Sequence, residues 1–194
     1  MAGPHENLEH AEHAAHTNKN IALLISVIAL FLAFSETLGK SAQTSAISYN
    51  VEASNLWAFF QAKTIRMTTL TTAAETRKID SAATAEAAIK DVMAKQIDTW
   101  QKTAARYNDE PDTNEGRKQL AARAKDAESK RDTAMARYHH YEVASAAFQI
   151  GIVLASATII TSMMMLAWLS VSLAGLGLMF TAIGFFAPHA VHLF

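Results

Sequence analysis

The 194-residue chain contains no cysteine, only three prolines and only seven glycines. The absence of cysteine excludes disulfides, cysteine-ligated zinc, iron–sulfur clusters and thiol catalysis. Few prolines and glycines, together with abundant Ala, Lys, Glu, Gln and Met, are typical of helices, and we find no convincing strand pattern. The formal net charge is only −1, so no overall field favours nucleic acid or an acidic partner.

Charge is almost missing from two long apolar stretches. The first runs from Ile21 to Leu38 and approaches the roughly 20 residues that cross about 30 Å of hydrocarbon. The second, Val143–Phe194, has no Lys, Arg, Asp or Glu and is long enough for two spans. Nearly all Lys and Arg lie between Lys40 and Arg137. The sequence therefore predicts an all-α integral membrane protein with three transmembrane helices and a polar helical domain between the first two.

The predicted organisation is a tail, three spans and one extramembrane domain. Trp168 is expected at the headgroups as an aromatic anchor, and a tight turn at Leu169-Ser170 makes the last two spans an antiparallel hairpin. Pro188 ends the third span because its ring cannot continue a helix. The boundaries are a His/Glu-rich tail over residues 1–19, spans over 20–38, 143–168 and 171–192, and the extramembrane domain over 39–142.

The polar middle shows heptad-like spacing on both sides of a turn-rich segment over residues 108–114. A 4-3 spacing of this kind predicts a coiled-coil seam on each arm of a helical hairpin, with a further helix upstream and a bend near residues 77–81. The spaced positions are Met93, Ile97, Trp100, Ala104 and Tyr107; Leu120, Ala124, Ala127, Arg131, Ala134, Tyr138 and Tyr141; and, upstream, Leu56, Phe60, Lys63, Met67, Leu70 and Ala74.

An aromatic and cationic cluster, Trp57, Phe59, Phe60 and Lys63, follows the first span. Such a cluster can anchor an interfacial helix at the membrane surface. It can equally anchor the core of the helical domain, because periodicity alone does not separate the two roles.

Small residues recur at helical spacing in the last two spans. Helices in lipid associate through close packing, which small residues permit. The small residues therefore predict either the contact between the two spans of the hairpin or a seam between subunits of a homo-oligomer. The positions are Ala147, Gly151 and Ala155, followed by Gly177, Thr181 and Gly184.

The N-terminal tail carries His10, His13 and His16 among glutamates at i,i+4 spacing. Imidazole and carboxylate at this spacing can share a divalent metal such as zinc or nickel, although the same pattern fits a solvated helical tail. His189 and His192 form a second pair, but three spans place the two termini on opposite sides of the membrane.

Glu36 is the one carboxylate within a predicted span. An intramembrane charge suggests an ion or proton role. An i,i+4 pair with Lys40 at the membrane interface explains it structurally.

No nucleophile–base set, HExxH motif or Gly-rich loop accompanies the plentiful Ser and Thr. We therefore expect neither an enzyme nor a cofactor. The favoured hypothesis is a structural, accessory or scaffold protein that self-associates or docks on a larger membrane complex. The alternatives are a homo-oligomeric channel lined by the first span, and a metal-responsive membrane protein.

The order of these features resembles the bacterial membrane family catalogued as domain of unknown function 4337. The most specific part is the run Leu-Trp-Ala-Phe-Phe-Gln-Ala-Lys at 56–63, supported by the run from His140 to Gly151 that leads into the last two spans. The resemblance implies an inner-membrane protein with its N-terminus inside and the helical middle in the periplasm. Family members place a basic cluster between the last two spans, and this chain has no charge there, so the best topology marker is missing.

Overall fold

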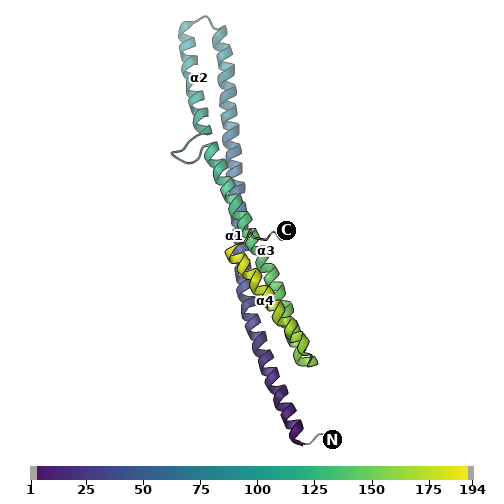
Figure 1. Cartoon of the computed structure of the whole chain (residues 1–194). Coiled ribbons are helices and arrows are strands. Elements are labelled where there is room, and N and C mark those ends of the chain that lie inside the picture. The colour runs from purple at the N-terminus through teal and green to yellow at the C-terminus, as the bar shows by residue number, and fades with distance from the viewer. Residues whose placement is uncertain (1–3, 192–194) are drawn as a thin grey trace. The chain divides into compact units, whose positions relative to one another are not determined.

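The computed structural model describes the backbone of residues 4–191 and the side chains of residues 19–191. Within that range the chain is all helical, which confirms the all-α part of the prediction (Figure 1). Three of the helices, α1, α3 and α4, are long and apolar enough to cross a membrane. The elements are α1 (Pro4–Ala83), α2 (Ala87–Asn108), α3 (Arg117–Thr161) and α4 (Met164–Phe186).

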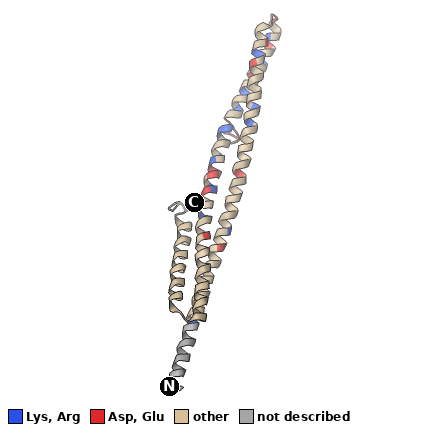
Figure 2. Cartoon of the chain, turned by 90° about the vertical axis from the view of Figure 1, so that its right-hand side faces the viewer, with Lys and Arg blue, Asp and Glu red and all other residues tan. Residues whose placement is uncertain are grey.

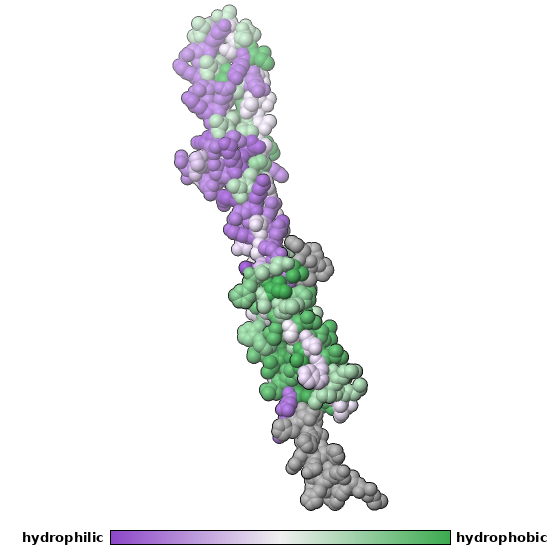
Figure 3. All heavy atoms as spheres, in the orientation of Figure 1, coloured by the Kyte–Doolittle hydropathy of each residue, from purple (hydrophilic) through white to green (hydrophobic). Residues whose placement is uncertain are grey.

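The chain forms two compact units. The apolar unit combines the chain up to Ala46 with the chain from Asp132 onward, and the polar unit is Ile47–Arg131. Both α1 and α3 contribute to both units, whereas α2 belongs to the polar unit and α4 to the apolar unit. Charged residues gather along the helices of the polar unit (Figure 2), and hydrophobic residues cover the visible face of the apolar unit (Figure 3).

The polar unit reverses direction at Thr84–Glu86, between α1 and α2, and not at the predicted turn over 108–114. Four side-chain contacts show this, because their α1 partners descend in number while their α2 and α3 partners rise. Both α2 and the first part of α3 therefore run antiparallel to α1, so the predicted hairpin between the two arms is wrong. The contacts are Arg77–Gln96, Lys63–Glu110, Trp57–Glu128 and Asn50–Arg131.

The loop 109–116 separates α2 from α3 but does not reverse the direction of the chain. Pro111 cannot supply a backbone donor, and Asn114 takes a left-handed conformation with φ 58°. Lys63 bonds Glu110 on one side of the loop, and Arg117 donates to Thr64 on the other side at 2.8 Å. Both ends of the loop are thus fixed to consecutive residues of α1, which keeps α2 and α3 on the same course.

The predicted 4-3 spacing is correct, but its partner differs from the prediction. Ile97 and Ala104 of α2 are buried. Leu120, Ala124 and Ala127 of α3 pack in one cluster with Ala53 and Leu56 of α1. Both seams therefore face α1, because the spacing identifies an apolar stripe and not the helix that covers it.

The apolar unit packs α4 against α1 and α3. Ile28 of α1 and Ala144 and Phe148 of α3 form its core, with Ala174 and Phe180 of α4 packed against them. The connector between α3 and α4 is Ser162–Met163, so the predicted turn at Leu169-Ser170 and the predicted span limits at 168 and 171 are wrong. Ser162 adopts φ 57°, a left-handed conformation that residues other than glycine rarely take.

The C-terminal end of α4 agrees with the predicted effect of proline. The helix ends at Phe186, and the backbone N–H of Ala187 still donates to the Ile183 carbonyl. Pro188 follows at once, and it has no N–H with which to continue the helical ladder. Proline thus acts as the stop signal that the sequence indicated.

Candidate interaction surfaces

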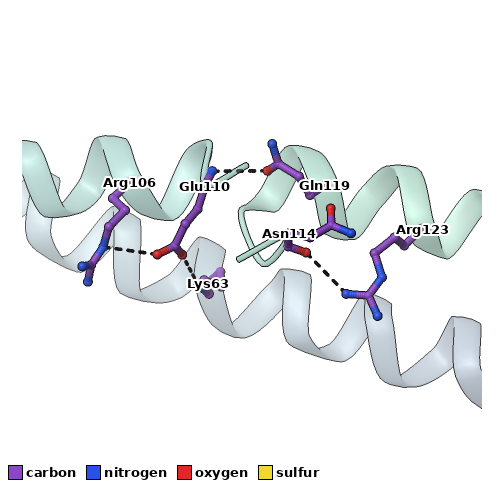
Figure 4. A network of polar contacts seen from close by, with 6 residues as sticks. All are labelled: Lys63, Arg106, Glu110, Asn114, Gln119 and Arg123. Atoms are coloured by element: carbon purple, nitrogen blue, oxygen red, sulfur yellow. Dashed lines mark hydrogen bonds and ion pairs between the residues drawn. The ribbon is translucent and has the colours of Figure 1, made fainter. Parts of the chain in front are cut away.

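An ion pair inside the polar unit joins α1 to the loop after α2. Lys63 Nζ lies 3.0 Å from Glu110 Oε2, and the two side chains are only 6% and 17% exposed. Arg106 approaches the other oxygen at 3.6 Å, and the backbone N–H of Glu110 donates to Gln119 (Figure 4). Phe59 and Tyr107 hold their rings 5.4 and 5.2 Å from the Lys63 ammonium. The pair is therefore enclosed and oriented on several sides.

The surroundings of Glu110 favour its charged form. The hydrogen bond from Lys63 lowers the pKa of the Glu110 carboxyl, burial opposes this shift, and the charges of Lys63 and Arg106 add to it. Hydrogen bonds from Lys118 and Gln119 likewise lower the pKa of the neighbouring Asp109. The loop is thus held to its helices by carboxylates that stay ionised near neutral pH.

The aromatic cluster, predicted either to anchor the helical domain's core or to anchor at the membrane surface, packs in the core. Trp57, Phe59 and Phe60 pack against the apolar cluster of Leu56 and Leu120. The indole N–H of Trp57 donates to Glu128 at 2.9 Å, and the Arg117 guanidinium lies 4.9 Å from the Phe60 ring. Since Lys63 is also buried, the prediction that this cluster anchors at a membrane surface is not supported.

Trp168 stays a candidate anchor at a membrane surface. It lies in the second turn of α4 and its side chain is 71% exposed. Its place is five residues beyond the connector, whereas the prediction put it at the end of the preceding span.

The predicted small-residue faces lie mostly at contacts within the apolar unit. A Cβ on Gly177 would come within 2.7–2.9 Å of the Phe148 ring, and one on Gly184 would lie 3.0 Å from His140 and Tyr141. Gly151 faces the Ser170 carbonyl, and Ala155 is fully buried. Ala147 and Thr181 are half-buried. These small residues allow α3 and α4 to approach closely.

Buried polar groups also form hydrogen bonds between the helices of the apolar unit. The Ser35 hydroxyl of α1 donates to the Tyr141 carbonyl at 3.1 Å, and the Ser170 hydroxyl of α4 donates to the Gly151 carbonyl at 2.7 Å. His140 is 1% exposed, and its Nε2 lies 3.0 Å from the Pro188 carbonyl while its ring stacks on Phe180. Sequence patterns contain no signal for these contacts, since serine and histidine also occur on solvated faces.

Glu36 has a different partner from the one predicted. Gln149 of α3 donates to its Oε1 at 3.2 Å, and no ion pair joins Glu36 to Lys40 among the side chains described. Both Glu36 and Gln149 are exposed on the outside of the apolar unit. Sequence analysis missed Gln149 because a lone amide in an apolar run has no spacing pattern.

The predicted metal ligands are only partly visible. His10, His13 and His16 lie on the backbone of α1, but their side chains, like the whole of His192, lie outside the described residues. His189 meets Thr133 at 3.1 Å. Across residues 19–191 no group of three His, Asp or Glu side chains is arranged to hold a metal ion.

Each unit carries an open groove. The groove of the polar unit measures about 730 Å³ and the groove of the apolar unit about 460 Å³. The first is lined largely by uncharged residues, namely Thr64, Ile65, Thr68, Thr69, Thr72, Ala73, Thr76 and Trp100, with Arg77 and Asp80. The second lies between α1 and α3 and is lined by polar residues that include Glu36, Lys40, Gln43, Glu142, Ser145 and Gln149.

Comparisons with known proteins give the family but no activity. Neither the curated proteins nor the solved structures include a match to this chain. The model of one family, described as domain of unknown function (DUF4337), matches residues 17–187. Because that match covers most of the chain and agrees with the resemblance in sequence, the protein belongs to the DUF4337 family.

Proposed function

We propose that this protein is a three-span membrane protein that acts as a scaffold or accessory subunit, with the polar unit as the part that contacts other helices. The observation that carries the proposal is the groove of the polar unit, whose walls are mainly threonine, with Ile65, Ala73 and Trp100 as apolar members. It lies on a unit whose helices carry many charged residues (Figure 2). An uncharged, partly apolar groove on such a surface is suited to protein contact.

Membrane insertion is supported by the surface of the apolar unit. The 23 residues of α4 contain no charged side chain and extend about 34 Å, enough for about 30 Å of hydrocarbon. Large apolar side chains face outward from every helix of the unit, for example Leu30 at 56%, Val153 at 65% and Phe186 at 82% exposed. Lipid would cover this surface, which in water would lead to aggregation.

The proposed location is a bacterial inner membrane with the polar unit in the periplasm. Lys19 stands at the start of the first apolar stretch, and a cation there favours the inner side. The many Lys and Arg of the polar unit do not oppose this orientation, because long segments translocate largely regardless of charge.

The scaffold role has more support than the channel role. Ser35, one of the few polar groups of the first span, is fully buried and bonded to the Tyr141 carbonyl. The hydroxyls of Ser26 and Thr37 donate to carbonyls of their own helix. These groups are therefore engaged within the subunit and would offer little to a passing ion.

Crosslinking in native membranes tests the scaffold role directly. Since the chain has no cysteine, Ile65→Cys gives a single probe in the groove, where Ile65 is 67% exposed. Thr71→Cys is the matched control, because it is exposed on another face of the same helix. A short reagent with a maleimide at one end and a photoreactive diazirine at the other reacts with the cysteine and, on irradiation, with any neighbouring protein. It should link Ile65→Cys to a neighbour much more efficiently than Thr71→Cys. Equal yields, or no adduct from a folded protein in its membrane, would contradict the role.

A further inference from the structure

The groove of the apolar unit places charged and amide side chains on a surface that is otherwise apolar. Glu36 and Lys40 come from α1, and Glu142 and Gln149 come from α3. All four side chains are exposed. The face that α3 turns toward α4 is a different one, marked by His140, Phe148 and Gly151, which contact α4.

These side chains are poorly suited to contact with lipid tails. Gln149 lies six residues beyond Val143, about 9 Å along the helix from the start of the apolar stretch. Hydrocarbon offers no hydrogen-bond partner, so a carboxylate–amide pair at such a position favours contact with another helix. The Glu36–Gln149 bond satisfies part of this need and leaves further lone pairs and donors open.

The groove contains charges of both signs, so the grooves of two copies can be complementary to each other. Lys40 forms no ion pair among the side chains described at positions 19–191, and it shares the groove with the carboxylates of Glu36 and Glu142. A two-fold symmetric contact brings the same surface of two copies together, so it requires both signs of charge within one surface. Two copies inserted in the same direction would also present these groups at the same depth.

We propose that this groove is the contact face between two copies of the chain, with Lys40 of each copy paired to Glu142 of the other. The Glu36–Gln149 pair of each copy then lies against protein and is shielded from lipid. This inference rests on the membrane insertion proposed above and names the surface through which the spans self-associate.

Charge exchange between two copies tests the pairing. Lys40→Glu places three carboxylates in each groove, and Glu142→Lys places two ammonium groups in each. Each variant alone should lower the crosslinked fraction about ten-fold. Equal co-expression of the two should restore it, because the carboxylate introduced at position 40 of one copy then faces the ammonium group introduced at position 142 of the other. The full chain is used, in its native membrane, with Gln43→Cys in the groove as the site of bismaleimide linkage.

The control and the readouts keep the inference separate from the proposed function. Ala182→Cys, exposed on α4 and outside the groove, should give little dimer with or without the charge changes. If neither charge variant changes the crosslinked fraction, the inference is overturned but the scaffold role is not contradicted. A linked foreign protein at Gln43→Cys, or a monomer that carries bound phospholipid in native mass spectrometry, would likewise overturn it. Loss of the protein from the membrane fraction on carbonate washing would instead contradict the insertion on which both rest.

Discussion

Both units are helical, but they differ in which polar side chains they bury. The polar unit buries a charge, Lys63, and surrounds it with aromatic rings and a carboxylate. The apolar unit leaves the Glu36 carboxylate exposed on the outside and buries the hydroxyls of Ser35 and Ser170. In water, burial of apolar area drives packing, whereas in lipid packing depends on close approach and interhelical hydrogen bonds. The contrast agrees with the proposal that the apolar unit lies in lipid and the polar unit in water.

The largest expected effect comes from removing apolar volume in the polar unit. Leu120 is fully buried between α1 and α3, so Leu120→Ala should lower the free energy of unfolding by about 2–5 kcal/mol. Ile79→Ala, at a position that is 72% exposed, should change it by less than about 0.5 kcal/mol. Thermal unfolding of the full chain in nanodiscs, followed by circular dichroism, measures both. Equal losses would mean that this unit has no core at Leu120.

The next effect concerns close approach in the apolar unit. Gly177→Ala forces the Phe148 ring to move and should cost about 1–3 kcal/mol. Gly175→Ala is the matched control, because nothing lies within 4 Å of the added carbon, and it should be neutral or slightly stabilising. The same unfolding experiment compares them, and a neutral Gly177→Ala would argue against tight packing of α4 on α3.

A smaller effect is expected for a single hydrogen bond. Trp57→Phe keeps an aromatic ring but removes the indole N–H that donates to Glu128, so it should cost about 1 kcal/mol. The double variant with Glu128→Ala, which removes the acceptor, tests whether the two residues act together. Additive losses would show that the bond contributes nothing of its own.

The smallest effect is one of charge alone and depends on pH. Glu110→Gln keeps the shape and an acceptor for Lys63 but removes the negative charge, so the unfolding midpoint at neutral pH should fall by a few degrees. The folded pKa of Glu110 lies below its ordinary value of 4.5, so its ionised form stabilises the fold above about that pH. This stabilisation is lost as the pH falls through the folded pKa, and the two proteins should then converge. Asp112→Asn, exposed in the same loop, is the control.

Sequence patterns predicted the helices and their apolar stripes better than the connections between them. Hydropathy located three membrane-competent helices because it depends only on composition over many residues. The connector Ser162–Met163 was missed because it contains neither glycine nor proline and lies in an unbroken apolar run. The break at Thr84–Glu86 was predicted only as a bend near residues 77–81, and the reversal of direction was missed because the segment lacks glycine and proline. Pro111 and its polar neighbours gave a strong turn signal where the chain keeps its course.

The candidate surfaces were predictable only where residue type decides the outcome. The glycines at 151, 177 and 184 were identified because close helix packing needs small residues. The partners Glu110, Glu128 and Gln149 were not, because each pairs with a residue more than 45 positions away and local spacing contains no such information. Predicting these contacts requires knowing which residues of two distant helices lie side by side, and the local sequence does not contain that information.

Cysteine accessibility is the most direct test of the claim that the two units face different solvents. Single cysteines are placed at exposed positions of both units in intact membranes, at Leu30, Val153 and Leu176 in the apolar unit and at Arg66, Lys95 and Lys125 in the polar unit. A hydrophilic maleimide should label the second set readily and the first set only after the membrane is dissolved in denaturant. Ready labelling of all six in the folded protein would show that the apolar unit lies in water and would contradict the claim.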